Sequence, residues 1–485
     1  MKENVVEYRY ERVATKITQL IQRGTLRPGE RIPSVRRISR QEKVSVSTAL
    51  QAYFLLEDRG LIEARPQSGF YVRLQSRRLP AEPKIVFPPQ SATRVGIGDL
   101  VSNIMKTSHN PGIVPLGLAA ASPDLFPTAK LHRTLAAVAR REGIAANRYD
   151  MAPGYPELRH QIARRSLDLG CGLSGDDIVI TAGCTDALNL CLRAVAGPGD
   201  VIAVESPTYF VLLTILESLQ MKAIEIPTDP REGVCLSELE SALDRRKVKA
   251  CLFMTNFHNP MGTCMSEENK KKLVEILAQR EIPLIEDDVY GDVCFGVSRP
   301  KVAKAYDRRG LVLLCSSFSK TLAPGHRVGW TAPGRYREQV ERLKNFSSAG
   351  NALLPQIMIA EFLKNGGYDH HLRNTRKGYA QQIQRMSQAV ARYFPEGTKV
   401  TRPVGGIVLW VELPQSVNSL ELYERALQRN ISVAPGPAFS ASQGYRNFIR
   451  VNCGFRWCDR IEEAVIVLGR LASGLTNQRI AGATL

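Results

Sequence analysis

Beyond about residue 115, short apolar runs alternate with helical stretches. The helical stretches include 185–196 and 266–280, and the strand-like runs are Val201 to Glu205, Ala250 to Thr255, Pro283 to Glu286 and Leu311 to Cys315. This alternation is typical of a mainly parallel sheet that is covered by helices. A further strand, Ile407 to Leu413, is followed by helix and strand near 418–453 and predicts a small C-terminal domain. The expected body is therefore an α/β fold with a large and a small domain.

The first 78 residues follow another pattern. Apolar residues recur at helical spacing over 8–23, a second short helix is expected to open at Ser34, and a third covers about 45–60. Two short runs joined by a turn within 61–74 predict a hairpin. Three helices followed by a hairpin are the plan of a winged helix-turn-helix.

The positive charge is densest in this N-terminal segment. The chain carries a formal charge of +18, and residues 1–78 contain sixteen Lys and Arg against eight Asp and Glu. A basic excess can serve nucleic acid, a membrane surface or anionic ligands. Because the helix and hairpin pattern agrees with the charge, we favour double-stranded DNA over a merely solvated surface. Phosphate contacts would supply affinity, and base-edge contacts would supply sequence choice.

Composition indicates a globular cytoplasmic protein. Hydrophobic residues make up 44% of the chain and charged residues 23%, and no apolar run approaches the roughly 18 residues that a membrane span needs. The first thirty residues contain no apolar signal segment. The ten cysteines form no Cys-x-x-Cys pair, so reduced thiols are expected and neither a zinc site nor another metal site is indicated.

A proline-rich linker is expected between the two parts. Residues 79–90 hold four prolines, and the following stretch to about residue 114 lacks a clear period, so we assign 79–114 as linker. The expected domains are thus 1–78, the linker, and a body over 115–485. Fully extended, residues 79–90 would span at most roughly 40 Å.

The stretch from Ser316 to Trp330 has the most specific chemical pattern. Lys320 follows a buried strand, lies among hydroxyls and precedes Arg327 by seven residues. Partial burial and a nearby cation keep such an amine deprotonated and nucleophilic, while Ser317, Ser319 and Arg327 can hold a phosphate. Taken alone, the segment is more simply a surface lysine flanked by serines. The Ser-x-x-Lys motif of penicillin-binding enzymes is excluded because Lys-Thr-Gly is absent.

Polar residues also follow other predicted strands, where ligands of parallel sheets gather. Asp287 and Asp288 stand at one strand end, and an ionised carboxylate there can keep a pyridine nitrogen protonated. A divalent metal is the alternative, but no ligand at suitable spacing supports it. Asn259, in an Asn-Pro turn, can direct its amide at a phenolate oxygen, although a plain loop turn is equally compatible.

Two further segments complete the pattern. Thr181 to Leu188 runs from a strand into a helix and places backbone N–H groups and the Thr185 hydroxyl where a phosphate can bind. Tyr209, after Glu205-Ser206-Pro207-Thr208, lies near a strand end and could stack on a ring. Each signal is weak alone, but their order before Lys320 is hard to obtain by chance.

From about residue 115 to 475, these motifs resemble the fold-type I pyridoxal 5′-phosphate enzymes of the aminotransferase class I and II group. The resemblance implies that Lys320 binds the cofactor as a Schiff base, that Asp287, three residues before Tyr290, pairs with the pyridine nitrogen, and that Asn259 and Tyr290 contact the 3-oxygen. Lys320, Asp287 and Tyr290 would be the catalytic group. The remaining implied contacts are ring stacking by Tyr209, phosphate binding by Cys184 (backbone), Thr185, Ser317 and Arg327, phosphate binding across a homodimer by Tyr149, and substrate-carboxylate binding by Arg450. Cys184 departs from the Ser or Gly that related sequences often hold.

Residues 8–74 resemble the GntR-type DNA-binding domain. The matching strings run from Gly24 to Arg36, from Val44 to Thr48, and from Gly60 to Ile62, with a wing from Ser68 to Val72. The resemblance implies DNA contacts by Arg36, Ser45, Ser47 and Thr48 and minor-groove contacts by Gln67 and Ser68. Val46 and Leu50 depart from the family, because they stand where other such heads place arginines.

A GntR-type head on an aminotransferase-like body resembles the MocR/GabR subfamily of bacterial regulators, and the body is most similar to its YdcR-type members. The resemblance implies a transcriptional regulator whose pyridoxal phosphate domain responds to an amino compound or to the cofactor. A working aminotransferase with an incidental head is the alternative, since the residues that transamination needs are present. A body that serves only as a dimerisation scaffold is less compatible with the intact lysine, aspartate and arginine set.

Overall fold

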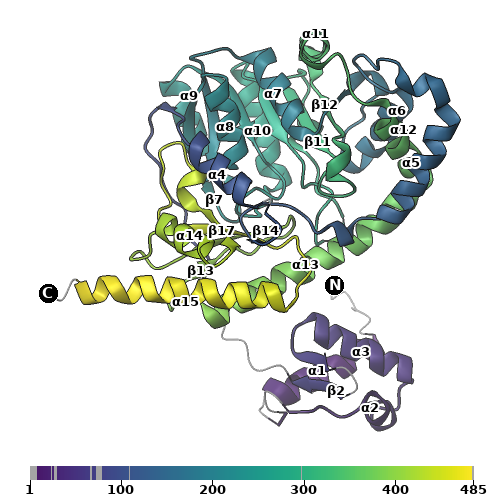
Figure 1. Ribbon diagram of the computed structural model, residues 1–485, viewed down its shortest axis with the longest axis vertical. Coiled ribbons are helices and arrows are strands. Elements are labelled where there is room, and N and C mark those ends of the chain that lie inside the picture. Colours follow the sequence, from purple (N-terminus) through teal and green to yellow (C-terminus); the bar gives the residue numbers. More distant parts are fainter. Residues whose placement is uncertain are drawn as a thin grey trace, which may run out of the picture. The chain divides into compact units, whose positions relative to one another are not determined.

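The computed structural model describes residues 8–22, 25–26, 30–65, 68–72, 79–108, 110–296 and 298–482. The chain divides into two compact units, which we call the head (to Leu79) and the body (from Pro80) (Figure 1). Each is described by itself. Within the described residues, no helix combines the length and the apolar character that crossing a membrane requires.

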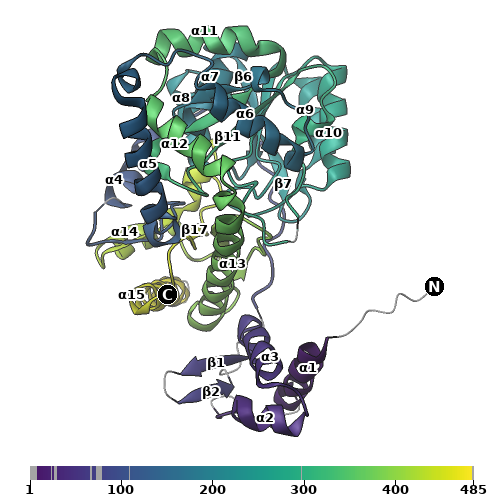
Figure 2. The same cartoon turned by 90° about the vertical axis from the view of Figure 1, so that its right-hand side faces the viewer.

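The head is a winged helix-turn-helix, as the sequence predicts. Helices α1 (Arg9–Gln22), α2 (Val35–Gln41) and α3 (Val46–Asp58) precede an antiparallel hairpin of β1 (Ile62–Arg65) and β2 (Gly69–Val72) (Figure 2). Ser34 and Ser45 cap α2 and α3, each accepting a hydrogen bond from a backbone N–H three residues on. The core includes apolar residues from all three helices and both strands. These caps and the apolar period explain why the sequence located the helices well.

One long mixed sheet forms the centre of the body. Its order is β3 (Thr93–Arg94), β7 (Lys222–Asp229), β6 (Val201–Ser206), β9 (Val248–Phe253), β10 (Leu284–Asp287), β11 (Val312–Ser317), β12 (Gly329–Ala332) and β5 (Val179–Thr181), with β8 (Gly233–Val234) beside β7. The run from β7 to β11 is parallel, and β12 is antiparallel to both of its neighbours. The predicted mainly parallel sheet is therefore confirmed.

Helices cover both faces of this sheet because its strands are apolar on both sides. Alternate residues of the same strands enter different clusters: Ile285 packs in the cluster that contains α7 (Cys184–Val195) and α8 (Phe210–Ser218), whereas Leu284 packs with α9 (Leu236–Arg245) and α10 (Glu267–Gln279). Other body elements are α5 (Thr128–Glu142), α6 (Pro156–Arg165), α11 (Arg337–Ser348), α12 (Leu353–Lys364), and the short strands β4 (Val114–Pro115) and β15 (Ile431–Ser432), which pair with each other.

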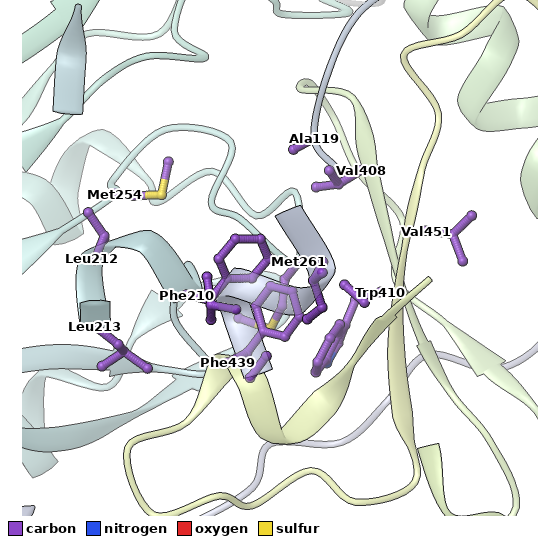
Figure 3. Packing of buried hydrophobic residues seen from close by; sticks show 14 of the residues in the cluster. Ala119, Phe210, Leu212, Leu213, Met254, Met261, Val408, Trp410, Phe439 and Val451 are labelled. Atoms are coloured by element: carbon purple, nitrogen blue, oxygen red, sulfur yellow. The ribbon is translucent and has the colours of Figure 1, made fainter. Parts of the chain in front are cut away.

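The smaller C-terminal domain contains a four-stranded antiparallel sheet. Its strands are β13 (Lys399–Val400), β14 (Val408–Glu412), β17 (Phe448–Asn452) and β16 (Ala434–Pro435), accompanied by α13 (Gly367–Tyr393), α14 (Ser419–Leu427) and α15 (Asp459–Gly482). Phe439 joins it to the large domain, because its ring centroid lies 5.2 Å from that of Phe210 and 5.1 Å from that of Trp410 (Figure 3). This shared core fixes β17, and thus Arg450, against the large sheet.

Residues 79–114 differ from the expected linker. The backbone oxygen of Ala81 accepts from Val400 N at 2.9 Å, Glu82 pairs with Arg231, and Gln90 donates to Glu238. The strand β3 then joins the large sheet, and α4 (Gly98–Ser108) buries Val101 and Ile104 in the main core, where Ile97 just before the helix is also buried. A two-residue strand and a short helix leave too weak a period to be seen in sequence.

Candidate cofactor site and DNA-contacting surface

Side chains from several strand ends meet at the carboxyl edge of the parallel strands. Asp287 is the last residue of β10, Lys320 follows β11 by three residues, and Cys184 begins α7 beside them. Electrostatic interactions connect Lys320 to Asp287, Cys184, Arg327 and Arg450. Segments that are far apart in sequence are therefore brought together around Lys320.

The surroundings of the Lys320 amine favour its neutral, reactive form. Its Nζ donates to the backbone oxygen of Ala119 at 2.6 Å and lies 5.7 Å from the centre of the Tyr290 ring. Burial, and then the charge of Arg450, lower the pKa of Lys320 to about 8. The side chain remains partly exposed, so a ligand can reach it. A neutral, accessible amine is the form that attacks a carbonyl carbon.

The adjacent aspartates have different partners. Asp287 Oδ1 accepts from the backbone N–H of Val289 at 3.0 Å and from Cys184 Sγ at 3.4 Å, and burial raises the pKa of Asp287 to about 6. Asp288 instead accepts from Asn256 and pairs with Arg299. Of the two, only Asp287 is among the groups that interact with Lys320.

Asn259, Arg450, Tyr209 and Tyr290 border the same space. Arg450 Nη1 donates to Asn259 Oδ1 at 3.1 Å, and Nη2 donates to Gly117 O at 2.5 Å. The guanidinium of Arg450 lies 6.0 Å from the Tyr209 ring centre, and burial lowers the pKa of Arg450 to about 10. Electrostatic interactions also join Tyr290 to Tyr209 and Arg450.

A polar cradle lies at the N-terminus of α7. Gly183 adopts φ +92°, and a Cβ there would lie 2.4 Å from Arg327 Nη2, so this position requires glycine. Arg327 donates to Ala182 O at 2.8 Å, Thr185 is exposed on the first turn of α7, and Ser317 ends β11. Free helix N–H groups with a guanidinium and hydroxyls suit a phosphate.

The described residues fit pyridoxal phosphate. Asn259 Nδ2 and Arg450 Nε are buried without a hydrogen-bond partner in the part of the chain that the structure describes. Asp287 forms no ion pair there, although it is buried. Such groups are costly unless a ligand satisfies them. A ring oxygen would accept from Asn259, a carboxylate would accept from Arg450, and a protonated pyridine nitrogen would donate to Asp287.

Tyr149 lies apart from the rest of the predicted group. Its side chain is 83% exposed in the single chain, and the nearby apolar side chains of Ile144 and Met151 are also exposed. The backbone of this loop bonds to the end of α11, because Ala152 N donates to Asn345 Oδ1 at 2.9 Å. This loop is thus fixed on the body with an aromatic side chain left uncovered.

In the head, Arg36 is exposed on α2, and Ser45, Ser47 and Thr48 form a hydroxyl cluster at the start of α3. Ser45 Oγ lies 2.8 Å from both Ser47 Oγ and Thr48 Oγ1. Ser68 Oγ lies 2.6 Å from the Tyr71 hydroxyl on the hairpin. The predicted contact Gln67 lies outside the described residues.

Sequence reasoning missed several supporting residues. The Cys184 side chain contacts Asp287, whereas only its backbone was expected to matter. Lys344 is buried and donates to Asp186 at 2.7 Å, which fixes the first turn of α7. The exposed arginines Arg37 and Arg40 accompany Arg36 on α2. A basic run in 36–40 was a visible signal for the last two, but no pattern marks the others.

Comparisons with known proteins agree with the folds of the head and of the body. Residues 115–457 match the family model for aminotransferase class I and II, and residues 9–72 match that of bacterial regulatory proteins of the gntR family. The uncharacterised HTH-type transcriptional regulator YdcR of Escherichia coli strain K12 is 41% identical over 463 residues, which cover 96% of this chain and 98% of that protein.

Solved structures resemble the body. Kynurenine aminotransferase of Pyrococcus horikoshii, in complex with PMP, has a TM-score of 0.72 and 30% identity over 77% of this chain and 94% of its own. LysN, the α-aminoadipate aminotransferase of Thermus thermophilus complexed with N-(5′-phosphopyridoxyl)-L-leucine, has a TM-score of 0.71 and 26% identity over 79% of this chain and 100% of its own. The predicted cofactor is confirmed at the level of the family and fold. The chain therefore belongs to the aminotransferase class I and II family and carries a gntR-family head, which is the MocR-type arrangement that the sequence predicted.

Proposed function

We propose that the protein is a transcriptional regulator whose head binds double-stranded DNA and whose body holds pyridoxal phosphate and responds to an amino compound. The observation that carries this proposal is the presence in one chain of a winged helix with exposed arginines and of a low-pKa lysine grouped with a buried aspartate and a buried arginine. The uncharacterised HTH-type transcriptional regulator YdcR matches over almost the whole chain. A protein that acts on DNA in this way works in the cytoplasm, as expected from the sequence.

The site residues would hold the cofactor through contacts to five of its parts. Lys320 Nζ would bind its carbonyl carbon, Asp287 would keep the pyridine nitrogen protonated, Tyr209 would stack on the ring, and Asn259 and Tyr290 would donate to the ring oxygen. The backbone of Cys184 with Thr185, Ser317 and Arg327 would bind the phosphate. When bound, the cofactor supplies an electron sink beside the amino group of a ligand.

Arg450 determines the ligand class in this proposal. Its guanidinium is fully buried, contacts neutral groups and leaves Nε without a partner among the described residues. A carboxylate is the group that satisfies a planar guanidinium best, through two parallel hydrogen bonds. An amino acid or another amino compound with a carboxylate therefore suits the space between Arg450 and Lys320.

The test compares duplex binding by the full chain and by three variants across salt concentrations. We expect affinity to fall steeply with salt, with a slope of about −0.9 per neutralised phosphate. Arg36→Ala should weaken binding and reduce the slope, whereas Arg392→Ala on α13 serves as the matched control. Lys320→Ala should lose the visible absorption of the lysine-bound cofactor but keep duplex affinity. Salt-independent duplex binding would refute DNA binding by the head. A visible cofactor band that persists in Lys320→Ala would refute the assignment of Lys320 as the cofactor lysine.

Aminotransferase activity is a second candidate function. The neutral Lys320 amine could move a proton between the ligand and the cofactor, and Arg450 could orient a carboxylate. Turnover with a panel of amino acids and keto acids tests it, with Arg450→Lys as the variant. Loss of affinity for carboxylates in that variant, with normal use of simple amines, is the expected pattern. If wild-type protein holds cofactor but turns over no pair, regulation alone stands.

A further inference from the structure

An exposed apolar stripe follows α3 of the head. Val46, Leu50 and Phe54 are spaced at i, i+4 and i+8, so they share one face of the helix. Val46 is 52% exposed and Phe54 is 50% exposed, while Leu50 is partly exposed. The adjacent face, with Ala49, Ala52, Tyr53 and Leu56, fills the core of the head. The stripe is therefore not required for folding.

The surroundings of the stripe identify what covers it. The helix itself contains no Lys or Arg, whereas α2 carries Arg36, Arg37 and Arg40 around an open hollow that Ser34 also lines. Hydroxyls of Ser45 and its neighbours cluster at the first turn of α3, beside Val46. An anionic partner that offers apolar groups between its charges matches this distribution. A protein surface would need no such row of cations.

Double-stranded DNA has this chemistry in its major groove. The groove admits an α-helix, phosphates border it, and the 5-methyl group of thymine is the apolar group on its floor. In helix-turn-helix proteins the first residues of the recognition helix contact base edges. Val46 occupies the first turn of α3, and Leu50 lies one turn further along the same face.

We propose that Val46 and Leu50 pack against thymine methyl groups and thereby select thymine at two positions of each half-site. The proposal rests on the proposed DNA-binding function and adds a means of base selection to it. Phe54 lies about 12 Å along the helix from Val46 at 1.5 Å per residue. It is therefore placed toward the sugar–phosphate backbone and contributes no base selection.

The experiment removes single methyl groups from the DNA. A duplex that binds the full-length, cofactor-loaded protein is first selected from a randomised library. Each thymine is then replaced by deoxyuridine, and affinity is measured by fluorescence anisotropy. Loss of one buried methyl group should weaken binding about fourfold at each of the two positions. Substitutions at other thymines should have no effect.

Protein variants assign the effect to the stripe. Val46→Ala should abolish the preference for thymine over deoxyuridine at one position, and Leu50→Ala should abolish it at the other. Val46→Thr keeps a methyl group at the same place and should retain the preference. Phe54→Ala is the matched control, and it should leave both preferences unchanged.

The outcomes separate this inference from the function on which it rests. If no duplex is selected, DNA binding by the head fails and the inference fails with it. If a duplex binds with steep salt dependence and Arg36→Ala weakens it, but every thymine tolerates deoxyuridine, DNA binding stands and the inference is overturned. In that event, a change of oligomeric state in Val46→Ala would identify a protein surface as the occupant.

Discussion

Two adjacent carboxylates at the end of β10 have different partners because neighbouring strand residues point to opposite sides. Asp287 faces the side of Lys320, and Asp288 lies in a buried network with Asn256 and Arg299. Alternation and the position of Tyr290 favour Asp287 from sequence as the partner of the pyridine nitrogen. Arg299 could not be predicted, because it comes from a loop without a period.

We predict opposite effects of the two amide substitutions. Asp287→Asn should weaken pyridoxal phosphate binding about ten- to hundredfold, because a hydrogen bond to a charged group is lost, and should leave thermal stability nearly unchanged. Asp288→Asn should lower the free energy of unfolding by about 3 kcal/mol, since it leaves a buried guanidinium partly unpaired. Cofactor titration and urea unfolding of both variants check this. Equal effects of the two substitutions on cofactor affinity and on the free energy of unfolding would contradict the assignment of Asp287 to the pyridine nitrogen.

The pH dependence of cofactor capture follows from Lys320. Its pKa falls from the ordinary value of 10.5 to about 8, so the reactive neutral amine is half populated near pH 8. The capture rate of added pyridoxal phosphate should rise about tenfold per pH unit below that value and level off above it. Stopped-flow absorbance measures this rate, and a midpoint near 10 would contradict it.

The lowered pKa of Lys320 also makes the stability of the apoprotein depend on pH. Between pH 8 and 10.5 the unfolded chain binds the Lys320 proton more strongly than the folded apoprotein does. Stability of the apoprotein should therefore rise with pH through that window and show no Lys320 contribution to the slope below it. Lys320→Met, which carries no titrating group, serves as the control.

At the scale of elements, long periodic segments were predictable and short docked ones were not. The strand runs and helices of the large domain, and the capped helices of the head, follow clear apolar periods. By contrast, β3 and α4 lie inside the stretch assigned as linker. Their position depends on tertiary pairing of Thr93 with Ala223 and on packing against a core that local sequence does not reveal.

Substitutions in this segment distinguish a docked element from a linker. Ile104→Ala should lower the free energy of unfolding of the body by about 2–4 kcal/mol, because Ile104 is fully buried and a cavity would remain. Val86→Ala is the matched control, since Val86 is 37% exposed and its loss should change stability by less than about 0.5 kcal/mol. Urea unfolding followed by tryptophan fluorescence measures both. No effect of Ile104→Ala would restore the linker assignment.

At the scale of the whole molecule, we predict a homodimer of bodies. Tyr149 and Phe346 are exposed by 83% and 84%, and the loop that carries Tyr149 is bonded to the end of α11, which carries Phe346. If the tyrosine completes the phosphate site of the second subunit, cofactor binding and pairing are linked. The sequence suggested this only through resemblance.

Phe346→Asp should shift the protein toward monomer and weaken cofactor binding together, because a charge would lie in a buried contact. Leu167→Asp, at another exposed apolar position, is the matched control and should change neither. Tyr149→Phe should keep the dimer but weaken phosphate binding. Light scattering combined with cofactor titration measures both properties. A monomer that binds cofactor at full strength would defeat the prediction.

The contacts of residues 80–92 with the body also affect the half-site spacing that such a dimer can bind. Their bonds to the body at Ala81, Glu82 and Gln90 remove them from the tether, so the roughly 40 Å that twelve extended residues could provide is not available to the head. In the proposed dimer, the two Pro80 positions are then held at one separation by the paired bodies. The spacing of the two points from which the heads extend becomes a dimension of the aminotransferase-like dimer itself. Extra residues inserted at the exposed Phe87 should loop out on the body surface and leave that spacing unchanged.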